Sequence, residues 1–85
     1  MTERTYRIDK NEEAVAEVQR YLRALSYTHK EIPHVGIDGI YGNETREAVR
    51  AFQLLYSLDA TGDADHITFL RLYEEFLISE AALKE

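Results

Sequence analysis

Apolar and polar positions alternate at helical spacing in three stretches of the chain, and turn-rich segments separate these stretches. The first stretch predicts a helix over about 11–26, with Asp9 and Asn11 as good N-cap residues near its start. The other two predict helices over about 43–57 and about 66–80. The apolar faces are Val15, Val18, Leu22 and Leu25, then Ala48, Val49, Phe52, Leu55 and Tyr56, and then Phe69, Leu70, Tyr73, Phe76 and Leu77. These faces predict an all-α, compact three-helix domain.

The segment between the first two predicted helices is too apolar to be a solvated linker. Pro33 disfavours helix at the residue before it, and the glycines that follow allow backbone angles that other residues resist. The apolar residues of this segment are Ile32, Val35, Ile37 and Ile40. We therefore expect a structured loop or a short hairpin here, with parts of it packed on the helices.

An imperfect internal repeat links the turns to the helices. Each copy has an apolar residue followed by glutamine, then a glycine, a threonine six residues after that glycine, and an apolar residue ten after it. The first copy consists of Val18-Gln19, Gly39, Thr45 and Val49, and the second of Phe52-Gln53, Gly62, Thr68 and Leu72. The repeat predicts two similar turns, with the second helix shared by both copies.

The polar members of the repeat predict structural roles. Gln19 and Gln53 lie beside core positions, where a buried amide most naturally bonds loop backbone and pins a turn. Thr45 and Thr68 are expected to cap helix starts. The Asp-Gly pair at the first turn is typical of a tight turn in which the carboxylate accepts backbone N–H bonds and glycine takes a positive φ.

The composition of the chain excludes several classes of function. With 10 Lys and Arg against 16 Asp and Glu, the net charge of −6 repels nucleic acid and anionic membranes, so neither is an expected partner. The chain has no cysteine, its serines occur in no nucleophile-elbow context, and His29 and His34 lack further ligands at metal spacing. We expect a binding protein without catalytic residues, metal or cofactor.

Four sequence segments follow one another along the chain. Each is common by itself, but their order and spacing together are specific. They are Val18-Gln19-Arg20-Tyr21-Leu22, the run from Ile37 to Val49, Phe52-Gln53, and Thr61-Gly62. Together they resemble the peptidoglycan-binding domain family, whose pattern joins V-Q-x-x-L to D-G-x-[FY]-G-x-x-T-x-x-A-V-x-x-F-Q and a further glycine turn. The resemblance covers about residues 13–73 and implies a three-helix module of bacterial and phage wall hydrolases that binds cell wall.

The chain departs from that family pattern at three positions. Ser26 stands where the first helix commonly ends in glycine, Ser57 stands where Gly-Leu follows the second helix, and Phe69 replaces the usual tryptophan. A residue other than glycine costs roughly 1 kcal/mol in the left-handed conformation of a helix C-cap. Each of the two serine helix ends is therefore either strained or terminated differently.

The resemblance implies a shallow groove near residues 36–42 that binds glycan or stem peptide. An exposed phenol stacks on the apolar face of a sugar ring while its hydroxyl reaches a polar group, and Tyr41 between two turn glycines suits this role. The full set of candidate ligand-binding residues is Tyr41, Asp38, Gly39, Gly42 and Tyr27. Tyr27 follows the first helix, and the sequence allows either a structural or a binding role for it.

The expected domain spans 11–77, with an N-terminal extension at 1–10 and a helical extension or tail at 78–85. The alternative function is a protein-interaction or oligomerisation module that keeps the fold without binding peptidoglycan, and that uses the C-terminal helix for a protein partner or for self-association. The first ten residues lack the apolar run of a signal peptide. We therefore expect a wall-associated module if the chain is part of a longer exported or phage protein, and a cytoplasmic one otherwise.

Overall fold

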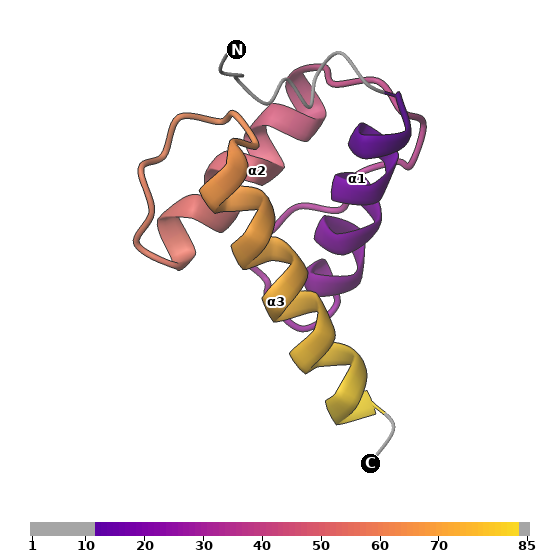
Figure 1. Cartoon of the computed structure of the whole chain (residues 1–85), viewed down its shortest axis with the longest axis vertical. Helices are drawn as coiled ribbons and strands as arrows, with labels where there is room; N and C mark the ends of the chain where they lie inside the picture. Colours follow the sequence, from indigo (N-terminus) through magenta and orange to yellow (C-terminus); the bar gives the residue numbers. More distant parts are fainter. Residues whose placement is uncertain (1–11, 84–85) are drawn as a thin grey trace, which may run out of the picture.

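Three helices form the fold of the computed structural model, which describes residues 12–83. They are α1 (Glu12–Ser26), α2 (Asn43–Leu55) and α3 (His66–Leu83). Figure 1 shows α3 crossing in front of the pair formed by α1 and α2, with its C-terminal end projecting beyond them. Residues 12–83 contain no strand, so the segment between α1 and α2 is a structured loop rather than a hairpin. The predicted all-α three-helix fold is confirmed, while the predicted caps at Asp9 and Asn11 lie outside the described residues.

The core lies between the three helices and extends under the long loop. Helix α1 contributes the largest share of it, and the loop adds Ile32 and Val35, which are buried as predicted. Ile37 and Ile40, from the same loop, remain largely exposed. The buried apolar residues are Ala14, Val15, Val18, Tyr21, Leu22, Leu25, Ile32, Val35, Ala48, Val49, Phe52, Ala64 and Leu72.

Helix α3 is apolar on two sides, and the predicted single face was wrong. Leu72 is fully buried, and Phe69 and Phe76 pack against the core. Leu70, Tyr73 and Leu77, assigned to the same inner face from the sequence, are instead exposed. When a helix carries apolar residues all round, spacing alone does not say which side its neighbours cover. Among residues 12–83, no helix is long and apolar enough to cross a membrane.

The two serine helix ends differ from each other. Ser57 adopts the left-handed conformation at φ 60°, and its N–H and that of Leu58 donate to the carbonyls of Leu54 and Gln53 at 3.3 and 2.8 Å. This is the double hydrogen-bond pattern that glycine usually completes after a helix. At Ser26, φ is not positive, and the hydroxyl donates to the carbonyl of Arg23 at 2.6 Å. The first alternative, strain, therefore holds at Ser57, and the second, a different termination, at Ser26.

A glutamine-braced corner as candidate binding site

The first corner of the fold is built around the buried amide of Gln19, which points from α1 into the long loop. Its Oε1 accepts the backbone N–H groups of Asp38 and Gly39 at 3.0 and 2.9 Å. Its Nε2 donates to the carbonyl of Ile40 at 3.0 Å and to the hydroxyl of Thr45 at 2.9 Å. One side chain thus holds the loop against the start of α2, as the sequence predicted.

The second corner repeats this arrangement around Gln53, from α2. Its Oε1 accepts the N–H of Gly62 at 2.8 Å, and its Nε2 donates to the carbonyl of Asp63 at 2.9 Å and to the hydroxyl of Thr68 at 3.0 Å. Both glutamine side chains are almost completely buried. The internal repeat is therefore a repeat of structure, with equivalent bonds at both corners.

Glycine is required at the centre of each corner. Gly39 and Gly62 have φ of 76° and 82°, values that other residues rarely adopt. A Cβ on Gly39 would lie 3.3 Å from the carbonyl oxygen of Glu12, and one on Gly62 would lie 2.7 Å from Cγ of Arg46. Each turn therefore lies close enough to a neighbouring helix that a side chain at its glycine would crowd that helix.

The predicted capping role of Thr45 and Thr68 was wrong. Each lies at the third position of its helix, where its hydroxyl accepts the glutamine amide of its own corner. The residue before α3, Asp65, supplies the cap instead, because its Oδ1 accepts the N–H of Thr68 at 2.9 Å. Helix α2 begins after Gly42 without a side-chain cap.

Asp38 is held as a carboxylate on the outer side of the first corner. Its Oδ1 accepts the N–H of Ile40 at 3.0 Å and the amide of Gln19 at 3.0 Å. The backbone hydrogen bond from Ile40, followed by the side-chain bond from Gln19, lowers the pKa of Asp38 below its usual value. The corner therefore presents a fixed negative charge at its surface.

A shallow hollow of about 320 Å³ lies beside this corner, between the first turn of α1 and the loop. Its floor and rim combine three carboxylates with the exposed side chain of Ile37. The lining residues are Glu12, Glu13, Ala16, Ile37, Asp38 and Gly39. Such a surface suits a ligand that has an amino or amide group next to an apolar group.

Tyr41 connects the two corners. Its hydroxyl donates to the carbonyl of Gly62 at 2.7 Å, and the guanidinium of Arg46 lies 5.3 Å from the centre of its ring. Arg46 also forms an ion pair with Asp63. The half-buried ring thus has a clear structural role, and its contact with a ligand stays a prediction.

A comparison with known families decides what this arrangement belongs to. The profile of the family described as "Putative peptidoglycan binding domain" matches residues 11–72, well over half of the chain. The chain belongs to this peptidoglycan-binding family. The match includes both corners, the hollow beside the first, and most of the core.

Two curated relatives share this domain at high identity. Over 50 residues the chain is 48% identical to a protein of Bacillus licheniformis named "Probable N-acetylmuramoyl-L-alanine amidase". The aligned segment makes up 58% of this chain and 14% of that relative. Over 47 residues the chain is 45% identical to the N-acetylmuramoyl-L-alanine amidase CwlA of Bacillus subtilis (strain 168). This segment makes up 54% of this chain and 17% of that relative. The chain thus spans less than a fifth of the length of these relatives. No solved structure matches it.

The peptidoglycan-binding domain brings only some of the predicted site residues together. Asp38 and Gly39 line the hollow, whereas Tyr27 lies at the opposite end of α1, roughly 20 Å away for a helix of this length. Tyr27 is exposed, and its hydroxyl accepts a bond from Nε of Arg23 at 3.1 Å. Gly42 precedes α2 and leaves open space where a Cβ would point.

Four residues of the hollow were missing from the candidate set: Glu12, Glu13 and Ala16 of α1, and Ile37 of the loop. The acidic pair Glu12-Glu13 is typical of a solvated helix face, and neither that pair nor Ala16 is marked by the family resemblance. They become part of a site only because Gln19 holds the loop against the first turn of α1. The repeat indicated that Gln19 holds the loop, but it did not indicate that the loop also faces the first turn of α1.

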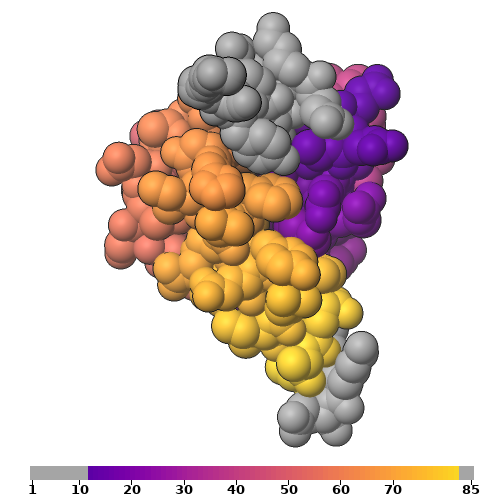
Figure 2. All heavy atoms as spheres, in the orientation of Figure 1, coloured from indigo at the N-terminus to yellow at the C-terminus, as the bar shows by residue number. Residues whose placement is uncertain are grey.

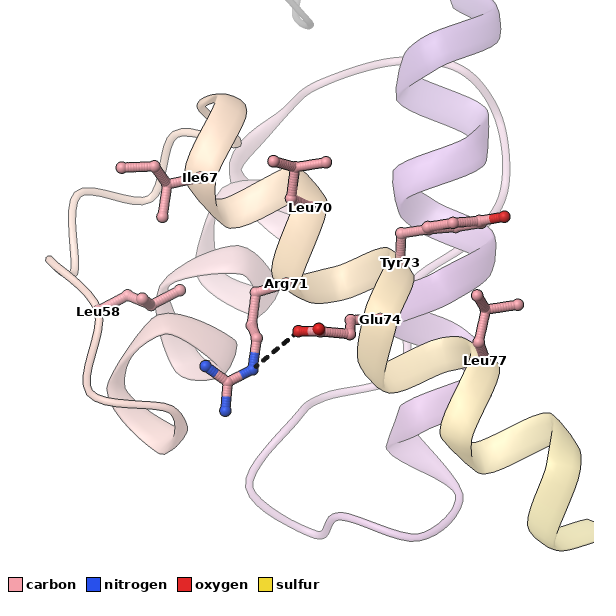
Figure 3. Close-up of a pocket in the computed structure, with 7 residues that line it drawn as sticks. All are labelled: Leu58, Ile67, Leu70, Arg71, Tyr73, Glu74 and Leu77. Atoms are coloured by element: carbon pink, nitrogen blue, oxygen red, sulfur yellow. Dashed lines mark ion pairs between the residues drawn. The ribbon is translucent and has the colours of Figure 1, made fainter.

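A second, larger groove of about 510 Å³ runs along the outer side of α3. Figure 3 shows its side chains projecting from α3, with Leu58 facing them from the loop before it. The lining residues are Leu58, Ile67, Leu70, Arg71, Tyr73, Glu74 and Leu77. Within residues 12–83, no group of three histidine, aspartate or glutamate side chains is placed to hold a metal ion.

Proposed function

We propose that this peptidoglycan-binding domain holds a linked or partner activity against bacterial cell wall without catalysing a reaction itself. The family assignment and the two amidase relatives support this function, since the chain matches a small part of each relative. The observation that carries the location of the site is the hollow beside the corner braced by Gln19. A module of this kind acts at the wall when it is part of an exported or phage protein, and stays in the cytoplasm otherwise.

The chemistry of the hollow favours the stem peptide of peptidoglycan over the glycan as the primary contact. Glu12, Glu13 and Asp38 suit an amino or amide group, and the exposed Ile37 suits a methyl group next to it. Tyr41 and Gly42 continue the same loop and are proposed to contact the adjoining sugar or peptide. Tyr27 is proposed as a separate, outlying contact for a long polymer.

A non-catalytic role agrees with the surroundings of Ser26, whose hydroxyl contacts a histidine. Oγ of Ser26 lies 2.5 Å from Nδ1 of His34, but the serine is nearly buried and its hydroxyl also bonds the carbonyl of Arg23. A nucleophile needs access to substrate, which this side chain lacks. The pair instead fixes the loop to the end of α1.

Weak binding is sufficient for such a module. A shallow, open hollow buries little of its ligand, so we expect modest affinity for a single wall fragment. Tethering to a second wall-directed domain makes rebinding intramolecular and raises the effective concentration. The domain thereby prolongs residence at the wall without stopping movement along it.

Cosedimentation with purified, insoluble sacculi tests the function and the site together. We expect the wild-type chain to sediment with sacculi and Ala16→Arg to bind at least about tenfold more weakly, because the new side chain fills the hollow. Leu54→Arg is the matched control, since Leu54 is exposed on α2 outside the hollow. Far-UV circular dichroism checks that both variants remain folded. Tyr41→Ala is a poorer probe because it also removes the bond to Gly62.

The outcomes of this experiment distinguish a failure of wall binding from a failure of the proposed site. Failure of the wild-type chain to sediment contradicts wall binding and favours the alternative, a module that keeps the fold for protein contacts. Full binding by Ala16→Arg contradicts the hollow as the site while leaving wall binding intact. The exposed apolar face of α3 favours protein contact as a second, independent function.

A further inference from the structure

The outer face of α3 is unusually apolar for a surface. Ile67, Leu70, Tyr73 and Leu77 are 66%, 51%, 44% and 47% exposed, and they line one continuous groove. In Figure 2 this helix occupies the centre of the visible face of the molecule. Contiguous exposed apolar surface of this kind marks an interaction site.

The spacing along this face is that of a coiled-coil seam. Ile67, Leu70, Glu74, Leu77 and Ala81 follow one another at alternating intervals of three and four residues, and all five are exposed. A seam of this period packs against another helix at a small crossing angle. The inner face of α3, which carries Phe69, Leu72 and Phe76, is already occupied by the core.

The charges on the groove indicate which helix fits. The groove lining includes one cation, Arg71, and one anion, Glu74, so the lining carries no net charge although the chain carries a net charge of −6. Two copies can therefore approach through this face without bringing their excess negative charge together. The Nε of Arg71 pairs with Glu75 of the same chain at 3.0 Å and lies 3.9 Å from Glu74, whose side chain is 70% exposed. Glu74 thus keeps capacity for a partner across an interface.

We propose that two copies of this chain associate through the outer face of α3 in an antiparallel, two-fold symmetric pair. A pair centred at the level of residue 72 sets Ile67 opposite Leu77 of the second copy and brings Arg71 beside its Glu74. Every contact then occurs twice, as two-fold symmetry requires. A parallel pair in register would instead oppose Arg71 to Arg71 and Glu74 to Glu74. The proposal is independent of wall binding, and a dimer would give two wall contacts per particle.

Sedimentation velocity on the full chain at rising concentration tests the pair. We expect a species of about twice the 9.9 kDa monomer mass to grow with concentration. Ile67→Lys and Leu77→Glu each place a charge against an apolar residue of the second copy, so each alone raises the dissociation constant at least about tenfold. Leu54→Lys, a charge placed at an exposed leucine of α2, leaves the association unchanged.

Mixing the two defective variants gives the decisive result. The antiparallel pair sets Lys from one chain opposite Glu from the other and leaves the native Ile67–Leu77 contact on the other side. The mixture therefore dimerises with a dissociation constant within about threefold of the wild-type value. A chain that stays monomeric up to its solubility limit, or a mixture that fails to dimerise, overturns the proposal. Both variants leave the hollow intact, so each still sediments with sacculi and loses only the contribution of the second wall contact. Failure of the pair therefore does not bear on wall binding.

Discussion

Ser57 shows how one residue can pay a local conformational cost while the fold stays intact. Its φ of 60° completes the hydrogen bonds that end α2, in the place where the family pattern has glycine. A side chain in this conformation crowds its own backbone, which costs about 1 kcal/mol. Ser26 occupies the corresponding family position after α1 without that cost, because its hydroxyl joins the loop to the helix.

Ser57→Gly is expected to raise the free energy of unfolding by about 1 kcal/mol, because glycine relieves the strained backbone while keeping both terminal bonds. For a domain of this size the midpoint of thermal unfolding rises by about 4–8 °C. Differential scanning calorimetry measures this shift. Ser26→Gly is the matched control and is expected to lower the midpoint, since it loses the hydroxyl bonds. An equal rise in both variants would contradict the different roles assigned to the two serines.

At the scale of elements, two buried glutamines stabilise the arrangement of the helices, which a larger core stabilises in longer chains. A chain of 85 residues buries only roughly 60% of the surface that its unfolded form exposes. Each glutamine compensates by satisfying the backbone of a turn and joining it to the helix that follows. The three helices are thus fixed to one another by their turns as well as by their apolar faces.

Gln19→Leu is expected to lower the free energy of unfolding by about 2–4 kcal/mol, because the N–H groups of Asp38 and Gly39 lose their acceptor. Gln53→Leu costs a similar amount through Gly62 and Asp63. Urea unfolding measures both values. Arg20→Leu, at an exposed position next to Gln19, serves as the control and changes stability by less than about 0.5 kcal/mol.

Amide hydrogen exchange adds spatial resolution to this prediction. Gln19→Leu accelerates exchange at Gly39 more than at Gly62, and Gln53→Leu does the reverse, because each amide braces its own corner. Equal acceleration at both glycines in either variant would show that the corners are not separate units.

The sequence predicted those features that its internal repeat marks. Gln19 bonds backbone 19 to 21 residues further along the chain and Gln53 bonds backbone 9 to 10 residues further along, yet the repeated order of glutamine, glycine and threonine already indicated both corners. Thr45 and Thr68 were misassigned because the third position of a helix and its cap differ by only a few residues. Each threonine hydroxyl accepts a hydrogen bond from a glutamine of the preceding helix, and the sequence around the threonine does not reveal that partner.

Features that depend on how helices meet were not predictable in the same way. Tyr73 was assigned to the core because α3 has apolar residues all round, and only the position of α1 shows which side is covered. The hollow joins Glu12 and Glu13 to Ile37 through folding of the loop. The family resemblance indicated the loop but not the helix turn that faces it.

For the whole molecule, the fold presents two separate surfaces on a small acidic body. The hollow lies beside the start of α1 and combines carboxylates with one apolar side chain. The groove along α3 is largely apolar and neutral in charge. These differences in chemistry suit a polar wall fragment at the first surface and a second protein copy at the other.

The most direct test of wall binding at the braced corner is a titration of isotope-labelled protein with soluble disaccharide–stem-peptide fragments released from sacculi. Amide chemical shifts report each residue separately, so weak binding is sufficient. The account predicts that the largest changes occur at Ala16, Ile37 and Gly39, while Leu70 and Leu77 on α3 stay unchanged. An absence of changes anywhere, or changes confined to α3, would contradict it.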